Sequence, residues 1–285
     1  MPTSVSHASP PPLLDLFALA KDNDNNVERQ FLEASAGTSL QAEALSTMSQ
    51  QILYSGKVTK NMHLGVLGDL LVNGKLENVH AWARNKAGSG NPLDWLKEKI
   101  GWAYSWHERR MLFEGYFVNG QEFLYGALNI GSLGATHYGN VSIVIDDVFL
   151  QNSPVTYLEG DSLELFLDSN DQLILPTLKK SISSQTQRHH LMAFKHRFRL
   201  DGTPQEDWPK MVCSKNEFVE VIFLQPLERS HITRVLIDAE FYNRLQDQLE
   251  AINFQLQEEV PPELATYVQV IEVLKKYNIR LETLS

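Results

Sequence analysis

The chain has 285 residues, and its 25 Lys and Arg against 35 Asp and Glu give a net charge of −10 with neutral His. A charge this negative disfavours a protein that is held to nucleic acid by bulk electrostatics. With 43% hydrophobic and 21% charged residues, the composition is that of a globular chain and excludes wholesale disorder. The single cysteine, Cys213, excludes an internal disulfide and CxxC metal or redox sites, and it fits a reducing compartment.

The first residues of the chain are rich in Ser, Thr and Pro. Residues 1–12 are therefore expected to form a disordered leader, and they carry no Lys or Arg ahead of the apolar run Leu13–Ala20, unlike a secretory signal peptide. A plain tail is one interpretation of this composition, and a leader for bacterial type III export is the other. No run of 18 apolar residues occurs, so the sequence predicts no membrane span.

Helical patterns dominate the first part of the chain. Apolar residues recur at helical spacing over residues 13–56, where a second helix is expected to begin near Ser39. A short strand is expected over Val58–Leu64, followed by a helix over Leu67–Asn73 that a glycine ends. After a Gly-rich loop, the pattern predicts one helix over Leu93–Phe113.

The second half is richer in strands. β-Branched and aromatic runs bounded by turn residues predict strands over Val141–Phe149, Val155–Leu158, Leu163–Leu167, Gln172–Leu175, Phe218–Leu224 and His231–Ile237. Helices are expected over Ala239–Glu259 and Glu263–Tyr277. The strands come in groups far apart in the sequence, without regular alternation with helices. The predicted fold class is therefore α+β and not a doubly wound sheet.

The most unusual segment runs from Tyr125 to Asn140. It holds four glycines in 16 residues, lies between two tyrosines and leads directly into a predicted strand. Glycines allow a ligand to approach the backbone, and tyrosines offer flat faces to a planar ring. The segment has neither the dinucleotide fingerprint nor a P-loop. An ordinary Gly-rich connector is the alternative interpretation.

Glu220 lies within the apolar strand predicted at residues 218–224. Because side chains alternate along a strand, Glu220 is expected to share a face with Phe218 and Ile222, and Glu217 to point the other way. A carboxylate on an apolar face costs free energy unless it is paired or used. The alternative is an edge strand that leaves Glu220 in solvent.

Other polar groups carry weaker signals. A lone His63 is more often structural than catalytic, and His189, His190 and His196 lack an acidic or cysteine companion at zinc-ligand spacing. Cys213 has no neighbour that argues for a nucleophile. Six basic residues form a patch, and its alternative roles are to meet phosphates, to meet an acidic partner or to face solvent: Lys179, Lys180, Arg188, Lys195, Arg197 and Arg199.

Three features occur in a fixed order along the chain: His63, the segment Tyr125–Tyr138, and Glu220. This order resembles the ADP-ribosyltransferase superfamily, whose members cleave NAD⁺ and move ADP-ribose to an acceptor. The chain is most similar to a bacterial family that shares YGALN, a GDS segment and a late VE, which are here Tyr125–Asn129, Gly160–Ser162 and Val219–Glu220. It also resembles CteC-type effectors, which ADP-ribosylate ubiquitin on threonine. The likeness extends over about residues 55–240.

The resemblance implies a fold and a domain organisation. The fold would be an ADP-ribosyltransferase-like split antiparallel β-sandwich with flanking N- and C-terminal helices. One domain would cover residues 13–285, with a helical part at 13–56, a catalytic core at about 57–240 and C-terminal helices over 239–285.

The resemblance also implies the residues of an NAD site without a metal. Glu220 would be the catalytic glutamate, bonded to a ribose hydroxyl, because a carboxylate stabilises the oxocarbenium-like ribose that forms as nicotinamide leaves. Tyr125 and Tyr138 would sandwich the nicotinamide ring. The implied NAD contacts are His63, Leu64, Gly65, Tyr125, Gly126, Ala127, Asn129 and Tyr138. Arginine-modifying relatives have a second glutamate at the position of Phe218, so this chain is expected to use another acceptor.

The expected function is mono-ADP-ribosylation of a protein, with a threonine of ubiquitin as the first candidate acceptor. The resemblance implies a monomeric virulence factor that a bacterium secretes by a type III-like route and that acts in the host cytoplasm. Three alternatives stay open: a nucleic-acid ADP-ribosyltransferase, which the net charge disfavours; an NAD glycohydrolase with water as acceptor; and a non-enzymatic interaction protein on the same fold.

Overall fold

The structure is a computed structural model that describes residues 12–100, 104–224, 226–254 and 259–284. The predicted disordered leader, apart from Pro12, lies outside the described residues. Within the described ranges, every helix is too short or too polar to cross a membrane.

Eight strands form one sheet, in the order β10-β9-β4-β1-β3-β7-β5-β6. All neighbours are antiparallel except β9 and β10, which are parallel. The strands are β1 (Lys57–Met62), β3 (Leu124–Asn129), β4 (Val141–Ile145), β5 (Val155–Leu158), β6 (Ile182–Ser184), β7 (Glu220–Phe223), β9 (Ile232–Asp238) and β10 (Arg280–Leu284). Outside this sheet, β2 (Lys75–Leu76) pairs with β8 (Leu227–Glu228). The predicted mixture of helices and a mainly antiparallel sheet is confirmed, and its division into a split sandwich stays a prediction.

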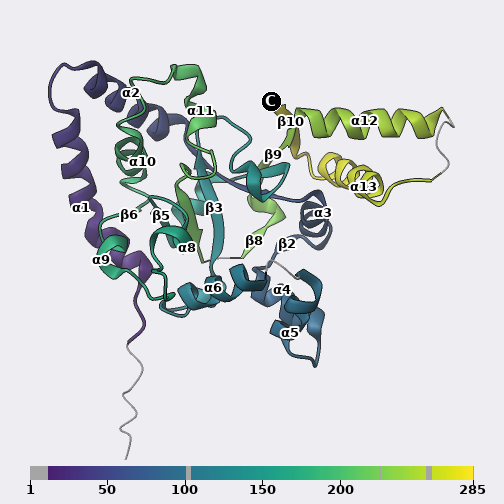
Figure 1. The fold of residues 1–285 in the computed structure, drawn as a ribbon. Helices are drawn as coiled ribbons and strands as arrows, with labels where there is room; N and C mark the ends of the chain where they lie inside the picture. Colours follow the sequence, from purple (N-terminus) through teal and green to yellow (C-terminus); the bar gives the residue numbers. More distant parts are fainter. Residues whose placement is uncertain (1–11, 101–103, 225, 255–258, 285) are drawn as a thin grey trace, which may run out of the picture.

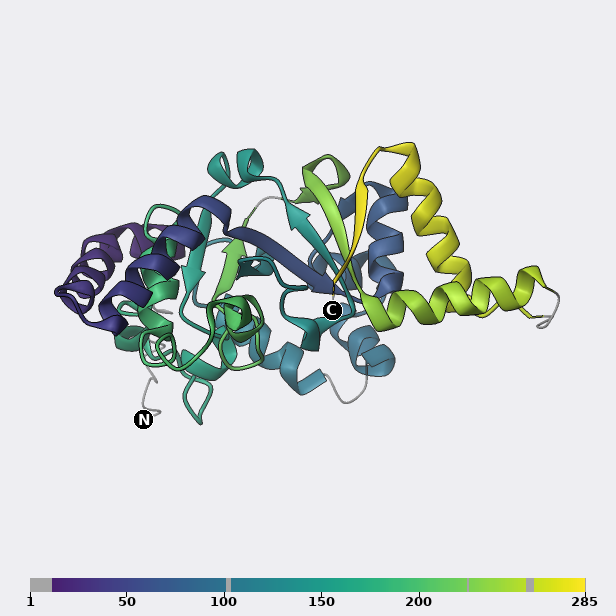
Figure 2. The same cartoon turned by 90° about the horizontal axis from the view of Figure 1, so that it is seen from above.

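Helices gather at both ends of the sheet and below it (Figures 1 and 2). At one end lie α1 (Leu16–Ser35), α2 (Leu40–Ser55) and α10 (Arg188–His196); at the other, α12 (Ala239–Asn253) and α13 (Pro262–Lys276) project from the body beside α3 (Leu64–Asn73). The remaining helices are α4 (Val79–Ala87), α5 (Pro92–Ile100), α6 (Tyr104–Glu114), α7 (Asp147–Gln151), α8 (Ser162–Leu165), α9 (Leu175–Leu178) and α11 (Trp208–Met211).

The N-terminal helices begin where the sequence supplies capping side chains. Asp15 accepts hydrogen bonds from the backbone N–H groups of Phe17 and Ala18, and Ser39 accepts one from Ala42. Such caps satisfy N–H groups that have no partner within the helix. The prediction of helices over residues 13–56, with a new one near Ser39, is confirmed.

Several predicted elements are wrong in type or extent. Leu163–Leu167 and Gln172–Leu175 are not strands of the sheet: the first holds α8, which Asp161 caps, and the second joins a turn at Asp168 to α9. The strand expected at Val141–Phe149 ends at Ile145, because Asp146 caps α7. A capping carboxylate placed before a short apolar run favours a helical turn over continued pairing.

Other differences concern missed strands. Of the helix expected over Leu93–Phe113, the structure describes α5 up to Ile100 and α6 from Tyr104, and residues 101–103 lie outside the described part. The strands β3, β6 and β10 were not among the predicted elements. β3 coincides with YGALN, where glycine and alanine weaken the strand signal.

The two faces of the sheet pack against different cores. From β7, Val221 and Phe223 enter the large core with α2, α3 and α13, and Ile222 enters a second core with α1, α6 and α8. Phe218, just before β7, packs against Ala127, Ala135 and Tyr138. The expected alternation along this strand is therefore confirmed.

The central strands β1 and β3 pair along only part of their length. Pairing joins Lys57–Thr59 to Ala127–Asn129, and beyond Thr59 β1 pairs with β4 alone. At the point of separation, a Cβ on Gly126 would lie 2.8 Å from the carbonyl oxygen of Thr59, so only glycine permits this approach. The separation leaves backbone and side chains of both strands facing a common space.

Candidate functional site

A cavity of about 750 Å³ opens where β1 and β3 part. Its walls come from the ends of β1 and β3, from β7, from α6 and from the segment α3–β2–α4. Six residues singled out from the sequence line it: His63, Tyr125, Gly126, Ala127, Tyr138 and Glu220. The fold thus brings together three segments that lie far apart in the chain.

Glu220 is a buried carboxylate on an interior strand of the sheet. β7 lies between β3 and β5, and Glu220 is 2% exposed, which excludes the alternative of an edge strand in solvent. Its Oε2 accepts the backbone N–H of Ser162 at 2.9 Å, and its Oε1 lies 3.5 Å from Nη2 of Arg110. Burial raises the pKa of Glu220 to about 7; Arg110 opposes this rise and Asp161 adds to it.

Arg110 is the main partner of Glu220, and the sequence analysis missed it. It is 2% exposed, and its Nη1 donates to Ser162 Oγ at 2.5 Å. Its guanidinium carbon lies 4.0 Å from the ring centroid of Tyr125 and 4.8 Å from that of Trp106. A usable signal existed: Trp106, Arg110 and Phe113 share one face of a helix, and a cation on such a face needs a partner.

Tyr125 and Tyr138 reach the cavity from two different segments. Tyr125, on β3, donates its hydroxyl to Glu114 Oε1 at 2.8 Å. Tyr138 donates its hydroxyl to Asp161 Oδ2 at 2.9 Å, and its ring packs at a right angle to Phe218. Burial raises the pKa of both phenols, so both stay neutral. One face of Tyr125 is covered by the Arg110 guanidinium, which the expected tyrosine sandwich did not include.

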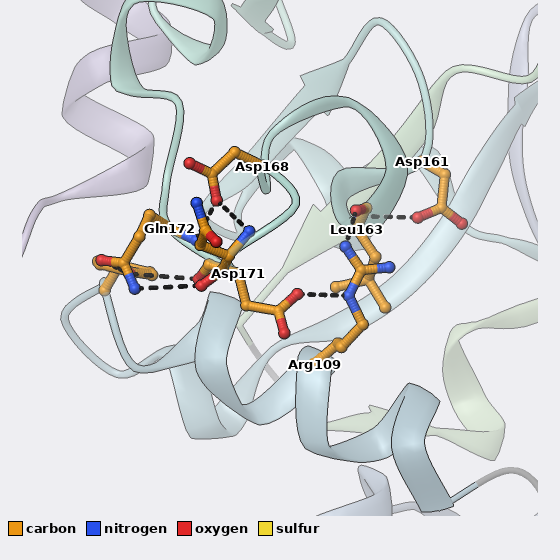
Figure 3. A network of polar contacts seen from close by, with 8 residues as sticks. Arg109, Asp161, Leu163, Asp168, Asp171 and Gln172 are labelled. Carbon is orange, nitrogen blue, oxygen red and sulfur yellow. Dashed lines mark hydrogen bonds and ion pairs between the residues drawn. The ribbon is translucent and has the colours of Figure 1, made fainter.

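The wall that carries Asp161 and Ser162 is tied to α6 (Figure 3). Arg109 donates through Nε to Asp171 Oδ1 at 2.7 Å and through Nη2 to the carbonyl of Leu163 at 3.0 Å. Asp161 Oδ1 accepts the backbone N–H of Leu163 at 2.8 Å. These bonds hold the two oxygens of Asp161 so that one caps α8 and the other receives Tyr138.

Lys60 is a second positively charged residue of the cavity, after Arg110, that the sequence analysis did not single out. It lies on β1 directly after the last pair with β3, and its Nζ donates to the carbonyl of Tyr125 at 2.9 Å. Burial and the nearby Arg110 lower the pKa of Lys60 to about 8, against the opposing effect of Glu220. Within KVTKNM, Lys60 shares one face of the strand with the apolar Val58 and Met62, which is the signal that could have found it.

The Gly-rich segment forms a tight loop between β3 and β4 that positions Tyr138 at the cavity. Gly139 has φ +148°, and a Cβ there would lie 2.2 Å from the carbonyl carbon of Met62. Asn129 Oδ1 accepts the backbone N–H groups of Gly131 and Ser132 at 3.0 and 2.9 Å. Gly139 and Asn129 therefore have structural roles in this loop, which supports the connector interpretation for these two positions.

The expected NAD contacts divide into two groups. Leu64 is buried in the large core, Gly65 lies exposed on α3, and Asn129 holds the loop; these three are absent from the described lining of the cavity. His63 is exposed and stands between β1 and α3, at the cavity wall. Their contacts with NAD stay predictions.

Lys195 and His196 of α10, and Arg199 after it, have partners and are not among the described residues that line the cavity. Lys195 donates to the carbonyl of Phe218 at 3.1 Å, and Arg199 pairs with Glu217 Oε1 at 2.6 Å. His196 is fully buried with its Nδ1 3.5 Å from Glu217 Oε2. Among the residues that the structure describes, no group of three or more His, Cys, Asp or Glu is placed to hold a metal ion. Cys213 is buried in the large core, where burial raises the pKa of its thiol to about 12.

The site is thus a deep cavity beside a central strand, with a buried carboxylate, a buried arginine, a lysine and two neutral tyrosines. No model of a known protein family and no curated protein sequence matches the chain. Among solved structures, a Thermus sp. 2.9 DarT in complex with ADP-ribosylated ssDNA is similar over 81% of this chain and 94% of that chain, with 11% identity and a TM-score of 0.36. A likeness this distant assigns neither a function nor an acceptor, so the residues of the cavity alone support the proposal below.

Proposed function

We propose that this protein cleaves NAD⁺ and transfers ADP-ribose to an acceptor, on an ADP-ribosyltransferase-like fold. The observation that carries the proposal is Glu220: a carboxylate 2% exposed on a central strand, facing a cavity of about 750 Å³ that Tyr125 and Tyr138 also line. A buried carboxylate is costly to a fold, so its position in a cavity favours a use for its charge.

The electrostatics of Glu220 suit a reaction that builds positive charge. As the N-glycosidic bond of NAD⁺ breaks, nicotinamide leaves with the bonding electron pair and the ribose becomes cation-like. Its pKa of about 7 means that Glu220 is partly protonated in the free protein near neutral pH. A bound pyridinium and a donating ribose hydroxyl would favour the ionised form, which then stabilises the transition state more strongly than the ground state.

The aromatic side of the cavity suits a planar cation. The Arg110 guanidinium, itself flat and positively charged, lies 4.0 Å from the Tyr125 ring centroid. A pyridinium ring can use the same electron-rich face only if Arg110 moves aside. Tyr138 would position the opposite side of the ring, and His63 the ribose and carboxamide.

For the acceptor we propose a protein hydroxyl, with a threonine of ubiquitin as the first candidate. Phe218 occupies the position of the second glutamate of arginine-modifying relatives and packs against Tyr138. An apolar residue at this position supports a neutral acceptor over a guanidinium. In this proposal the protein is a monomeric bacterial effector that acts in the host cytoplasm.

The test is release of nicotinamide from NAD⁺, with labelled ADP-ribose followed by mass spectrometry of ubiquitin and of a mixed lysate. Glu220→Ala is expected to lower the rate by about a hundredfold to a thousandfold without unfolding the protein. The matched control is Glu217→Gln, a carboxylate in the neighbouring loop that faces away and pairs with Arg199. Full activity of a folded Glu220→Ala variant would refute the proposed function, and an unmodified ubiquitin would refute only the choice of acceptor.

A further inference from the structure

We propose that Lys60 is the general base that takes the proton from the acceptor when ADP-ribose is transferred. This inference rests on the proposed function and assigns a role to a residue of the same cavity. Four features support it: the place of Lys60 in the fold, the hydrogen bonds of its amine, the charges around it, and the engagement of Glu220 elsewhere.

Lys60 stands where the two central strands separate. Thr59 is the last residue of β1 paired with β3, and Lys60 is therefore the first whose side chain can pass between the strands. Its Nζ reaches the backbone carbonyl oxygen of Tyr125 at 2.9 Å, so the amine is held at the backbone of the residue whose ring is proposed to hold nicotinamide. Both residues line the cavity that contains Glu220.

The surroundings of Nζ favour a neutral amine. An ammonium group has three N–H donors, and among the described residues the carbonyl of Tyr125 is the one acceptor hydrogen-bonded to it. Burial and Arg110 lower the pKa of Lys60 to about 8, so a substantial fraction is neutral at slightly alkaline pH. A neutral amine that donates one N–H to Tyr125 keeps its lone pair available to accept a proton.

Glu220 is poorly placed to act as this base as well. Its Oε2 is held by the Ser162 N–H at 2.9 Å, and its Oε1 faces Arg110 at 3.5 Å. In the proposed reaction its charge is needed by the ribose cation. A second group near the cavity must therefore accept the acceptor's proton.

The proton balance of the step is simple. Nicotinamide leaves as a neutral molecule with the electron pair of the C1′–N bond and requires no proton. The oxygen of the acceptor hydroxyl then forms a bond to C1′, its O–H bond breaks, and the proton moves to Lys60 Nζ, which becomes an ammonium. Solvent later removes that proton and regenerates the amine.

Other titratable groups of the cavity also affect how the reaction rate depends on pH. The titratable groups that line the cavity with Lys60 are Arg110, Glu114 and His107 from α6, Tyr125 from β3, Tyr138, Glu220 from β7, His63 after β1, and Asp69, Lys75 and Glu77 from the segment α3–β2–α4. Arg110 stays charged and Tyr125 stays neutral, because both have raised pKa values. Deprotonation of Glu220 and then of Lys60 should each raise the rate of the wild-type reaction as pH increases.

Two variants test whether Lys60 acts as a base or only holds the backbone of Tyr125 in place. Lys60→Arg keeps a positive charge and a donor for the Tyr125 carbonyl but cannot act as a base, whereas Lys60→Met removes all three. With NAD⁺ and water as acceptor, both variants are expected to lose at least about a hundredfold in rate. Thermal unfolding of each variant checks that the fold is retained.

Azide distinguishes the missing base from other defects. Azide is an anion over the working pH range and attacks without giving up a proton, so it should restore NAD⁺ cleavage in Lys60→Arg and form ADP-ribosyl azide. In that reaction the pH profile should keep the rise near the pKa of Glu220 and lose the rise near that of Lys60. Glu220→Gln should not be restored, because azide does not replace a stabilising carboxylate.

The outcomes identify which proposal fails. Wild-type-like rates in Lys60→Arg with water, or no restoration by azide in a folded Lys60→Arg, would overturn the role of Lys60 while leaving the proposed function intact. Wild-type protein that releases no nicotinamide with water, azide, ubiquitin or the mixed lysate would refute the proposed function, and the inference would fall with it.

Discussion

Replacing Glu220 by Gln should remove a pH-dependent cost to the fold. In the native protein the pKa of this carboxyl is about 7, whereas its ordinary value is 4.5. The unfolded chain therefore releases the Glu220 proton at lower pH than the folded chain does. Between these two pH values the native state loses stability as pH rises, because the unfolded state is ionised first. Below pH 4.5 both states are protonated and the cost disappears.

The size of the effect follows from the difference between the two pKa values. At about 1.4 kcal/mol per pH unit, Glu220 costs the fold about 3 kcal/mol above pH 7. About 2 kcal/mol of this cost should develop between about pH 5.5 and about pH 8.5. Over that range the unfolding free energy of Glu220→Gln should therefore rise by about 2 kcal/mol relative to that of the wild type. Gln keeps an acceptor for the Ser162 N–H, so the comparison isolates the charge.

Urea unfolding of both proteins at several pH values measures this difference. Glu217→Gln is the control: hydrogen bonding from His196, with Arg199, lowers the pKa of Glu217 to about 2, so its stabilising effect is lost only as pH falls below 4.5. Its difference from wild type should be flat over the same pH range. A stability difference between Glu220→Gln and wild type that does not change with pH would show that Glu220 has an ordinary pKa, and the electrostatic reasoning would be wrong.

Three further substitutions test the walls of the site. Gly139→Ala should destabilise the protein by about 3 kcal/mol or more, because the new Cβ meets the backbone of Met62 at 2.2 Å in a region of φ that favours glycine; thermal unfolding near the wild-type temperature would contradict this close approach. Gly65→Ala should leave the unfolding free energy unchanged or raise it by about 0.5 kcal/mol, since a Cβ there meets nothing within 4 Å. If NAD⁺ approaches this backbone, the same substitution should raise the KM for NAD⁺. An unchanged KM would count against Gly65 as an NAD⁺ contact. Tyr138→Phe should cost about 1 kcal/mol through loss of the bond to Asp161, and equal unfolding free energies at matched pH would mean that this bond adds nothing net.

Local chemistry in the sequence was enough to predict much of the secondary structure. Ser39 marks the start of α2, and the β-branched run at residues 141–145 marks β4. The alternation around Glu220 correctly separated the two faces of β7. The same local reasoning failed at residues 163–175, where short apolar runs suit either a strand or a helical turn and the capping carboxylates of Asp161 and Asp168 decide.

The sequence by itself determined which residues can supply charge and flat faces: a carboxylate at 220, tyrosines at 125 and 138, and glycines that let the backbone pass closely. Only the tertiary structure decided their partners. Arg110 reaches Glu220 across 110 positions of the chain, and Lys60 reaches the Tyr125 carbonyl across 65. Hydrophobic periodicity describes neighbours within a helix or strand, whereas burial of a charge depends on which segments pack together. The partial separation of β1 from β3 is of this kind, because it depends on β4 pairing with the far end of β1.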